Sequence, residues 1–188
     1  PVTTAVWTTT DASVLTVSAT GQATAARPGR VTVTATSGTL QGSLALRVVP
    51  DVAGTWTGSV ARVQLACASG STTPICAPGA GTGGSLTLRL TQVGDQLTGT
   101  LLDSAEPTAT VPLTGSLQAD DQVALSGTVS VPATAPTLRV EASTLRASYD
   151  PTLGTLTGSY TLNVDRARAG ATLAGDYRAQ VQFRDVRK

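Results

Sequence analysis

The stretch TWTGSV, residues 55–60, carries a pattern that returns along the chain. An apolar residue, a hydroxyl residue, a glycine and a second hydroxyl residue recur in the same order in QLTGTL (96–101), PLTGSL (112–117), ALSGTV (124–129) and TLTGSY (155–160). Because side chains alternate along a strand, each glycine shares a face with apolar neighbours, and the Thr and Ser residues lie on the other face. The pattern predicts strands with one apolar face and one solvated face.

The recurring glycine needs a reason, because glycine inside a strand costs up to about 1 kcal/mol relative to alanine. One explanation is that the strands bend and pack tightly around a narrow interior. The other is that the missing side chains leave a ligand cavity. We favour bending and packing. A further strand with Leu173, Gly175 and Tyr177 is expected to place its glycine on the same inner face.

Working outward from this pattern, residues 52–188 are predicted to form eight strands. Turn sequences separate several of them: VGDQ (93–96), ADDQ (119–122) and DPTLG (150–154). Short connections make consecutive strands antiparallel, and closing such a meander removes both edges. The prediction is an eight-stranded antiparallel up-and-down β-barrel, with strands near 55–66, 84–93, 96–103, 109–118, 122–131, 137–149, 154–164 and 172–186.

GTW at 54–56 resembles the Gly-x-Trp signature of the lipocalins and the wider calycin group, and together with LTGT it is similar to avidin-like barrels. The resemblance implies that Trp56 plugs one end of the barrel and that Arg178 or Arg184 packs over it. Biotin binding does not carry over, because the avidin site needs several Trp residues and this barrel has only Trp56.

Residues 1–49 read as short strands broken by turns, which is typical of an all-β sandwich. They resemble the bacterial Ig-like domains of group 2 in the order Trp7, Asp11–Ser13, Val14–Val17, Gly21 to Gly29 and Val31–Thr36. The family's opening strand has no counterpart, so we expect a truncated sandwich with an open edge and a partly exposed core. Pro50 and Asp51 mark the predicted domain boundary.

Composition narrows the function classes. The formal charge of +1 gives no field that would attract nucleic acid, and no segment approaches the roughly 18 apolar residues of a membrane helix. The absence of His excludes Ser–His–Asp and Cys–His catalysis and weakens any metal site. We therefore expect no enzyme activity, no metal and no cofactor. The acidic residues read as solvated turn or outer-face residues: Asp103, Glu106, Asp120, Asp121 and Asp176.

Cys67 and Cys76 lie in the loop-like segment CASGSTTPIC. Two unrelated buried thiols are possible, but a flexible loop buries thiols poorly, so we favour a disulfide worth about 2–3 kcal/mol. A disulfide would place the chain in an oxidising compartment. The basic residues Arg166, Arg168, Arg187 and Lys188 are interpreted as solvated surface or, alternatively, as a contact for an anion or a partner.

These observations favour a non-catalytic interaction protein that is periplasmic or on the bacterial cell surface. It would contact protein partners, as an accessory subunit of a larger envelope or membrane-bound assembly. The alternative is a small-ligand carrier of the lipocalin type, with a hollow barrel and the loop 66–84 as a lid.

Overall fold

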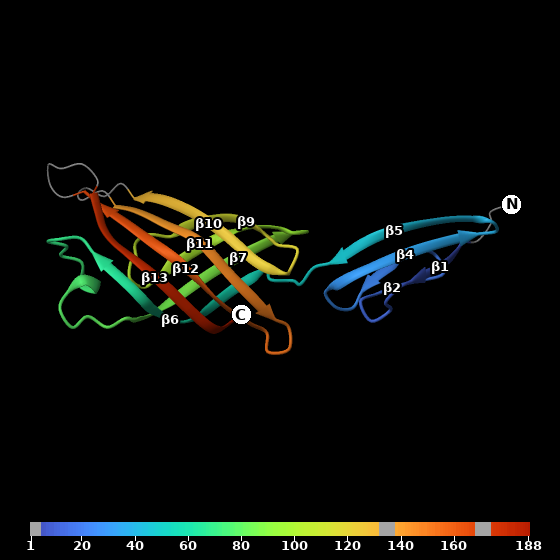
Figure 1. Cartoon of the computed structure of the whole chain (residues 1–188), viewed down its shortest axis with the longest axis horizontal. Helices are drawn as coiled ribbons and strands as arrows, with labels where there is room; N and C mark the ends of the chain where they lie inside the picture. Colours follow the sequence, from blue (N-terminus) through green and yellow to red (C-terminus); the bar gives the residue numbers. More distant parts are fainter. Residues whose placement is uncertain (1–4, 132–137, 168–173) are drawn as a thin grey trace. The chain divides into compact units, whose positions relative to one another are not determined.

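Strands make up almost all of the regular structure in the computed structural model, which describes residues 5–131, 138–167 and 174–188 (Figure 1). The one helical segment in this part of the chain is a 3-10 turn, η1, at Pro74–Cys76. The chain divides into two compact units, Pro1–Pro50 and Asp51–Lys188. The prediction of an all-β fold is confirmed.

The first unit contains two small sheets that face each other across a core. One sheet has the order β1-β4-β5 and the other pairs β2 with β3. The buried core consists of Val14, Leu15, Val31 and Val33. The strand bounds are Val6–Thr9 (β1), Leu15–Val17 (β2), Ala23–Ala25 (β3), Gly29–Ser37 (β4) and Leu40–Val48 (β5).

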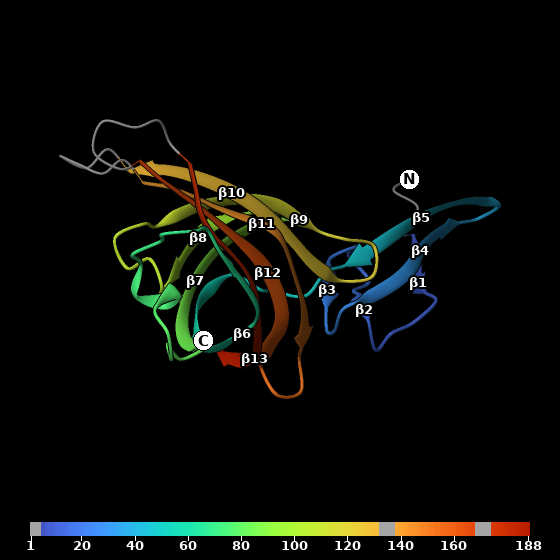
Figure 2. The same cartoon turned by 60° about the vertical axis from the view of Figure 1, so that its left-hand side comes forward.

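The second unit is a closed barrel in which every strand pairs antiparallel with its sequence neighbour and β13 returns to β6 (Figure 2). This is the up-and-down topology that the sequence predicts. The strands are Gly54–Cys67 (β6), Gly83–Val93 (β7), Gln96–Asp103 (β8), Val111–Leu117 (β9), Gln122–Val131 (β10), Leu138–Asp150 (β11), Thr155–Arg166 (β12) and Ala174–Arg187 (β13).

Large side chains fill the barrel interior. Trp56, Tyr160 and Phe183 are fully buried, together with leucines from five strands: Leu88, Leu97, Leu101, Leu113, Leu145, Leu156 and Leu162. The hydroxyl residues of the repeated pattern take the other face, and Thr57, Thr98 and Thr114 are exposed. The alternation that the sequence predicts is therefore present in the structure.

The repeated glycines lie where neighbouring strands approach most closely. A Cβ atom built on Gly99, Gly115, Gly127 or Gly158 would lie within 3.0 Å of a backbone carbonyl oxygen on the adjacent strand. Each of these positions is therefore filled by neighbouring backbone, with no open space for a side chain. This favours tight strand packing over a glycine-lined cavity as the reason for the pattern.

Strand β13 departs from the predicted alternation near its start. In the pairing of β12 with β13, Val164 lies opposite Tyr177 and Asp165 lies opposite Gly175, so Asp176 is an extra residue in a β-bulge. The expectation that Gly175 faces inward is wrong, because the bulge leaves it exposed. Leu173, which was expected on the same face, lies outside the described residues.

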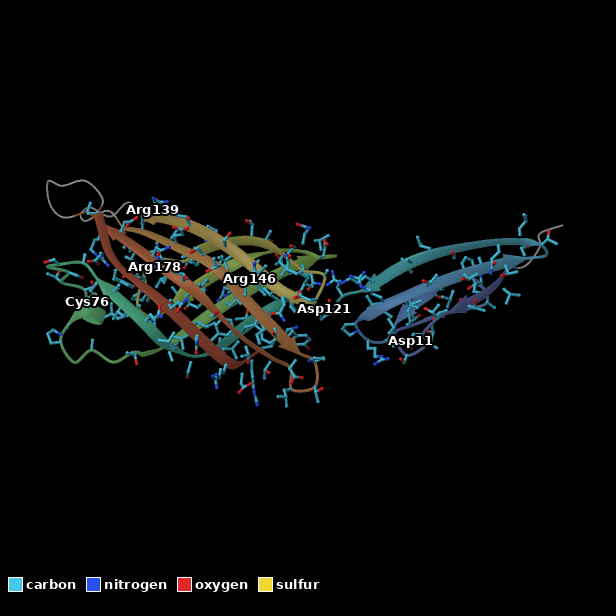
Figure 3. The ribbon with its side chains drawn as sticks, viewed as in Figure 1. Asp11, Cys76, Asp121, Arg139, Arg146 and Arg178 are labelled. Carbon is cyan, nitrogen blue, oxygen red and sulfur yellow. A yellow bond between two sulfur atoms is a disulfide. The ribbon has the colours of Figure 1, made fainter. Side chains whose placement is uncertain are left out.

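The barrel has two different ends, and Figure 3 shows Asp121 at one and Cys76 at the other. The hairpin end carries the three predicted turns, each with one residue at positive φ: Gly94, Asp121 and Gly154. The loop end carries the connections 68–82 and 104–110. Most of the buried polar chemistry lies at the loop end.

Candidate functional site

Two buried hydrogen-bond networks lie at the loop end of the barrel. The first joins Arg62 of β6, Asp103 at the end of β8 and Tyr160 of β12. The Arg62 Nη2 group donates to one Asp103 carboxylate oxygen, and the Tyr160 hydroxyl donates to the other. The backbone N–H of Ala105 donates to the same carboxylate at 2.8 Å. The Arg62 and Asp103 side chains are both only 2% exposed, so this is a fully buried ion pair.

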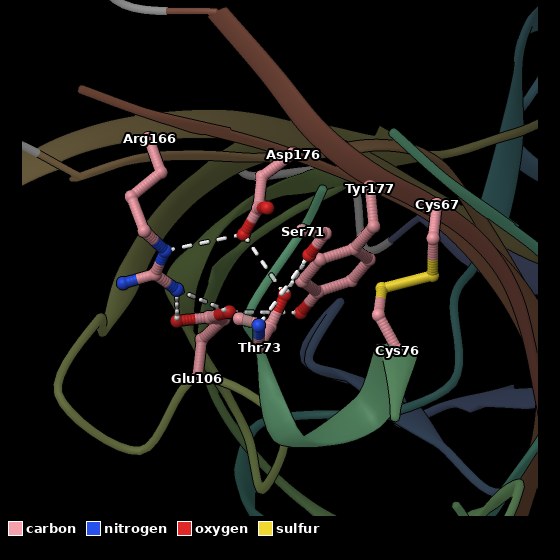
Figure 4. The surroundings of a disulfide bond; sticks show 8 residues. All are labelled: Cys67, Ser71, Thr73, Cys76, Glu106, Arg166, Asp176 and Tyr177. Atoms are coloured by element: carbon pink, nitrogen blue, oxygen red, sulfur yellow. Dashed lines mark hydrogen bonds and ion pairs between the residues drawn. A yellow bond between two sulfur atoms is a disulfide. The ribbon is translucent and has the colours of Figure 1, made fainter. Parts of the chain in front are cut away.

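The second network is built around Arg166, the last residue of β12 (Figure 4). Its Nη2 group donates to both Glu106 carboxylate oxygens, at 3.1 and 3.2 Å, and its Nε group donates to Asp176 at 3.1 Å. The Tyr177 hydroxyl donates to Glu106 at 3.0 Å, and the Thr73 hydroxyl donates to Asp176 at 3.0 Å. Arg166 therefore fastens the connection 104–110 to the barrel through Glu106, and Asp176 of β13 fastens the connection 68–82 through Thr73.

The electrostatics of the second network follow from burial and from these donors. Burial raises the pKa of Glu106 above its ordinary value, against the opposing effects of Arg166 and Tyr177. Burial also raises the pKa of Asp176, but hydrogen bonds from Ser71, Arg166 and Thr73 outweigh it, and the net pKa is lowered. Burial raises the pKa of Tyr177 as well, so its hydroxyl remains a donor at physiological pH.

Cys67 and Cys76 form a disulfide with a Cα–Cα distance of 5.9 Å, which confirms the predicted pairing. The bond fastens η1 to the last residue of β6, and Figure 4 shows it beside the Arg166 network. The connection 68–82 is thus held by a covalent bond and by the Thr73 hydrogen bond to Asp176. Both fixings keep this loop against the barrel end.

The structure corrects the prediction that three carboxylates are solvated. Asp103, Glu106 and Asp176 are each at most 4% exposed, because Arg62, Arg166 and two tyrosines pair with them. Asp120 and Asp121 do lie in a hairpin turn, as predicted, where the Asp120 carboxylate accepts a backbone hydrogen bond.

The sequence did contain a signal for part of this site. Strand alternation that places Trp56, Gly58 and Val60 inside the barrel also places Arg62 inside. The same alternation from Leu97 to Leu101 reaches Asp103, and from Tyr160 it reaches Arg166. Charged residues at inward positions of barrel strands indicate a buried network. No such signal exists for Asp176, because the bulge that turns it inward has no sequence mark.

A pocket of about 420 Å³ lies at the loop end, with Arg62 among the residues that line it. Its walls come from η1 and the glycine-rich stretch that follows it, and from the connection 104–110. The Arg62 Nη1 group donates to the Gly83 carbonyl at 2.9 Å, whereas its Nε group has no acceptor among the described residues.

The hairpin end is closed by Trp56, whose indole N–H donates to the Val52 carbonyl at 2.9 Å. Tyr149 meets the indole edge-on at a centroid distance of 5.8 Å, and the Lys188 ammonium lies 5.2 Å from the ring centroid. This is a cation–π contact.

The expectation that Arg178 or Arg184 covers Trp56 is not met. Alternation along β13 turns both side chains outward. Arg178 pairs with Ala66, at the other end of β6 from Trp56, and Figure 3 shows Arg178 nearer to Cys76 than to Asp121. Arg187 and Lys188 are exposed, Arg166 is half-buried in its network, and Arg168 lies outside the described residues.

An apolar groove of about 470 Å³ lies in the first unit. Its lining includes Leu44 and Leu46 of β5, Val17 of β2, Ala23 of β3 and Trp7 of β1. Leu44 is 62% exposed although most of the residues that line the groove are apolar. Among the described strands β5 pairs only with β4, so its other edge has no strand partner there.

The described residues contain no cluster of three or more His, Cys, Asp or Glu side chains that could hold a metal ion. At the loop end the carboxylates are already occupied by donors from the protein, which fits a structural role for both networks. Within the same residues, no helix has the length and apolarity needed to cross a membrane.

Comparison with known proteins identifies one domain. The family model described as bacterial Ig-like domain (group 2) matches residues 2–48. This match supports the Ig-like character of the first unit and indicates a non-catalytic surface or interaction domain. No curated protein and no solved structure matches the chain.

Proposed function

We propose that this chain is a non-catalytic interaction protein of the bacterial envelope, whose first unit captures an extended strand of a partner protein. In this proposal the chain is an accessory subunit of a larger envelope assembly. The observation that carries it is the apolar groove beside the edge of β5 that has no strand partner among the described residues.

An extended strand fits this surface because the apolar groove lies beside the unpaired edge of β5 among the described strands. A free strand edge presents backbone N–H and C=O groups that another strand can pair with. A strand added there would direct every second side chain toward Leu44, Leu46 and Val17. A helix would leave the backbone groups of β5 unpaired. The preferred partner segment therefore alternates small or medium apolar residues with polar ones.

The disulfide supports placement outside the cytoplasm, where such bonds persist. The match of residues 2–48 to a bacterial Ig-like domain is consistent with the same location. Periplasm and cell surface both satisfy these observations.

The carrier alternative draws less support from the barrel. Trp56, Tyr160 and Phe183 occupy the interior, and the repeated glycines abut neighbouring backbone. An interior of eight strands has room for side chains or for one small ligand, and here side chains take it.

The proposal is tested by placing a photo-crosslinking amino acid at Leu44 in the full chain, within native envelopes. We expect one discrete adduct whose crosslinked peptide in the partner is an extended, alternating apolar segment. Adding a synthetic peptide of that sequence should then slow hydrogen exchange of the β5 amides.

The matched control is the same crosslinker at Ala45, the next residue of β5, whose side chain lies on the opposite face of the sheet. Position 45 should give no such adduct. Equal adducts at both positions, or none at position 44, would reject the groove as the docking surface.

A further inference from the structure

The pocket at the loop end is large enough to hold a small molecule. Its volume of about 420 Å³ falls within the range of roughly 300–1,000 Å³ that is usual for ligand sites. A single water has a share of only about 30 Å³ in the liquid. Pro74, Ile75, Ala105 and Pro107 give the pocket apolar walls, and Arg62 is the one charged residue among the described residues that line it.

Arg62 has an unmet requirement for a hydrogen-bond acceptor. The residue is only 4% exposed, and its two Nη groups are bonded to the Gly83 carbonyl and the Asp103 carboxylate. Its Nε group has no acceptor within the described part of the chain. Buried N–H groups are nearly always paired, because an unpaired one has lost its water without compensation. Among the described residues, an arginine that lines the pocket thus keeps one donor without an acceptor.

The charge of Arg62 decides which acceptor suits it. Asp103 already neutralises the guanidinium, and Tyr160 and Ala105 further occupy the Asp103 oxygens. A second carboxylate would bring an uncompensated negative charge close to Asp103 in a buried setting, which is costly. A neutral carbonyl oxygen accepts a hydrogen bond without adding charge.

We infer that this pocket binds a small uncharged molecule that carries a carbonyl oxygen. The oxygen accepts a hydrogen bond from Arg62, and the carbon skeleton packs against Ile75 and the two prolines. Nε has almost no exposed surface, so binding as proposed requires the guanidinium to turn toward the pocket when the ligand binds. The site lies outside the barrel interior and is independent of the groove in the first unit.

The test uses two probes of equal shape and different charge, propionamide and propionate. Ile75 is the only isoleucine of the chain, so its methyl resonances report on this pocket without ambiguity. Titration of the whole labelled protein with propionamide should shift the Ile75 methyls and the Arg62 Nε–H resonance together, with saturation in the millimolar range expected of so small a ligand. Propionate should bind at least about tenfold more weakly.

Arg62→Lys keeps a positive charge for Asp103 but removes the Nε–H donor. It should weaken the propionamide effect on Ile75 at least about tenfold. The control is Arg139→Lys, at a half-exposed arginine on the barrel surface, which should bind propionamide as the wild type does.

Three results would overturn the inference. The first is the absence of any shift at Ile75 and Nε up to the solubility limit of propionamide. The second is propionate binding as tightly as propionamide, which would reject the neutral class. The third is undiminished binding by a folded Arg62→Lys protein. If that variant does not fold, the wild-type titration with the two probes decides alone.

Discussion

Gly115 and Gly127 lie in neighbouring strands β9 and β10, where a Cβ would come within 3.0 Å of the Ala124 and Pro112 carbonyl oxygens. A valine at either position must push the strands apart. We expect Gly115→Val and Gly127→Val to lower the free energy of unfolding by about 1–3 kcal/mol or more, the usual cost of overpacking with backbone strain added. Chemical denaturation of the two variants measures this.

Thr114→Val provides the matched control for these glycines, because Thr114 is exposed on the outer face of the same strand. Its change in stability should stay within about 0.5 kcal/mol, as is usual for surface substitutions. A gain of stability at both glycines would instead mean that they border empty space, and would restore the cavity interpretation.

Glu106 should give the barrel an unusual dependence on pH. Its folded-state pKa is raised by burial above the ordinary value of 4.5, so the folded protein binds a proton more readily than the unfolded chain. The ionised form therefore costs stability at neutral pH, and this cost falls as pH decreases from the raised pKa to 4.5. Relative to Glu106→Gln, the wild type should gain stability over that window, by at most about 1.4 kcal/mol per pH unit.

Asp176, in the same network, should change stability with pH in the opposite direction to Glu106. Its pKa is lowered below the ordinary 3.8, so its ionised form stabilises the fold at higher pH, and that stability is lost as pH falls through 3.8 and below. Unfolding curves for wild type, Glu106→Gln and Asp176→Asn over a pH series separate the two. A wild type that loses stability relative to Glu106→Gln as pH falls toward 4.5 would contradict the assignment for Glu106.

At the residue scale the sequence predicts packing better than polar pairing. Alternation alone places Trp56, Leu97 and Leu113 inside the barrel, because a two-residue period is a local property. The partners of Glu106 are 60 and 71 positions further along the chain, at Arg166 and Tyr177. No local sequence pattern encodes such pairings, so sequence analysis predicts that a carboxylate in a loop is solvated even when it is buried.

At the scale of elements, strand β11 contains a bulge with a strained residue. Pairing with β12 loses register between Ser143 and Arg146, and Thr144 there has φ 51°. This left-handed conformation is unfavourable for a β-branched side chain. Thr144→Gly should relieve the strain and raise the free energy of unfolding by up to about 1 kcal/mol.

The comparison for Thr144 is Thr114→Gly, at another exposed threonine, which lies in a regularly paired stretch of β9. There glycine should cost stability, by roughly 0.5–1 kcal/mol, since nothing is relieved and the unfolded chain gains entropy. Thermal melts of both variants should therefore move in opposite directions. A loss at Thr144 as large as that at Thr114 would show that the threonine side chain, through its contact with Thr161, outweighs the strain.

Element boundaries follow from turn chemistry wherever a tight turn is present. The predicted strands 96–103 and 122–131 coincide with β8 and β10, because the turns beside them contain Gly94 and Asp121 at positive φ. Bulges in β11 and β13 could not be predicted, since they depend on how two distant strands settle into register.

At the scale of the whole molecule, repetition of one short pattern was enough to predict the barrel. Eight amphipathic strands with short connections have few ways to bury one face, and closure is the one that leaves no edge. The first unit shows the converse, because β5 ends its three-stranded sheet and has no second strand partner in the described part of the chain. The sequence of the first unit predicts its strands, but it does not predict which segment pairs with the edge of β5.

The barrel closes by pairing β13 with β6, which brings Phe183 opposite Val60. Without β13 the barrel cannot close, because β6 and β12 then each keep one unpaired edge. Closure is therefore a late and long-range event, of the kind that makes folding slow. If the chain is exported, as the proposed location requires, a barrel that closes only when β13 pairs with β6 leaves the chain unfolded for translocation and lets it close afterwards.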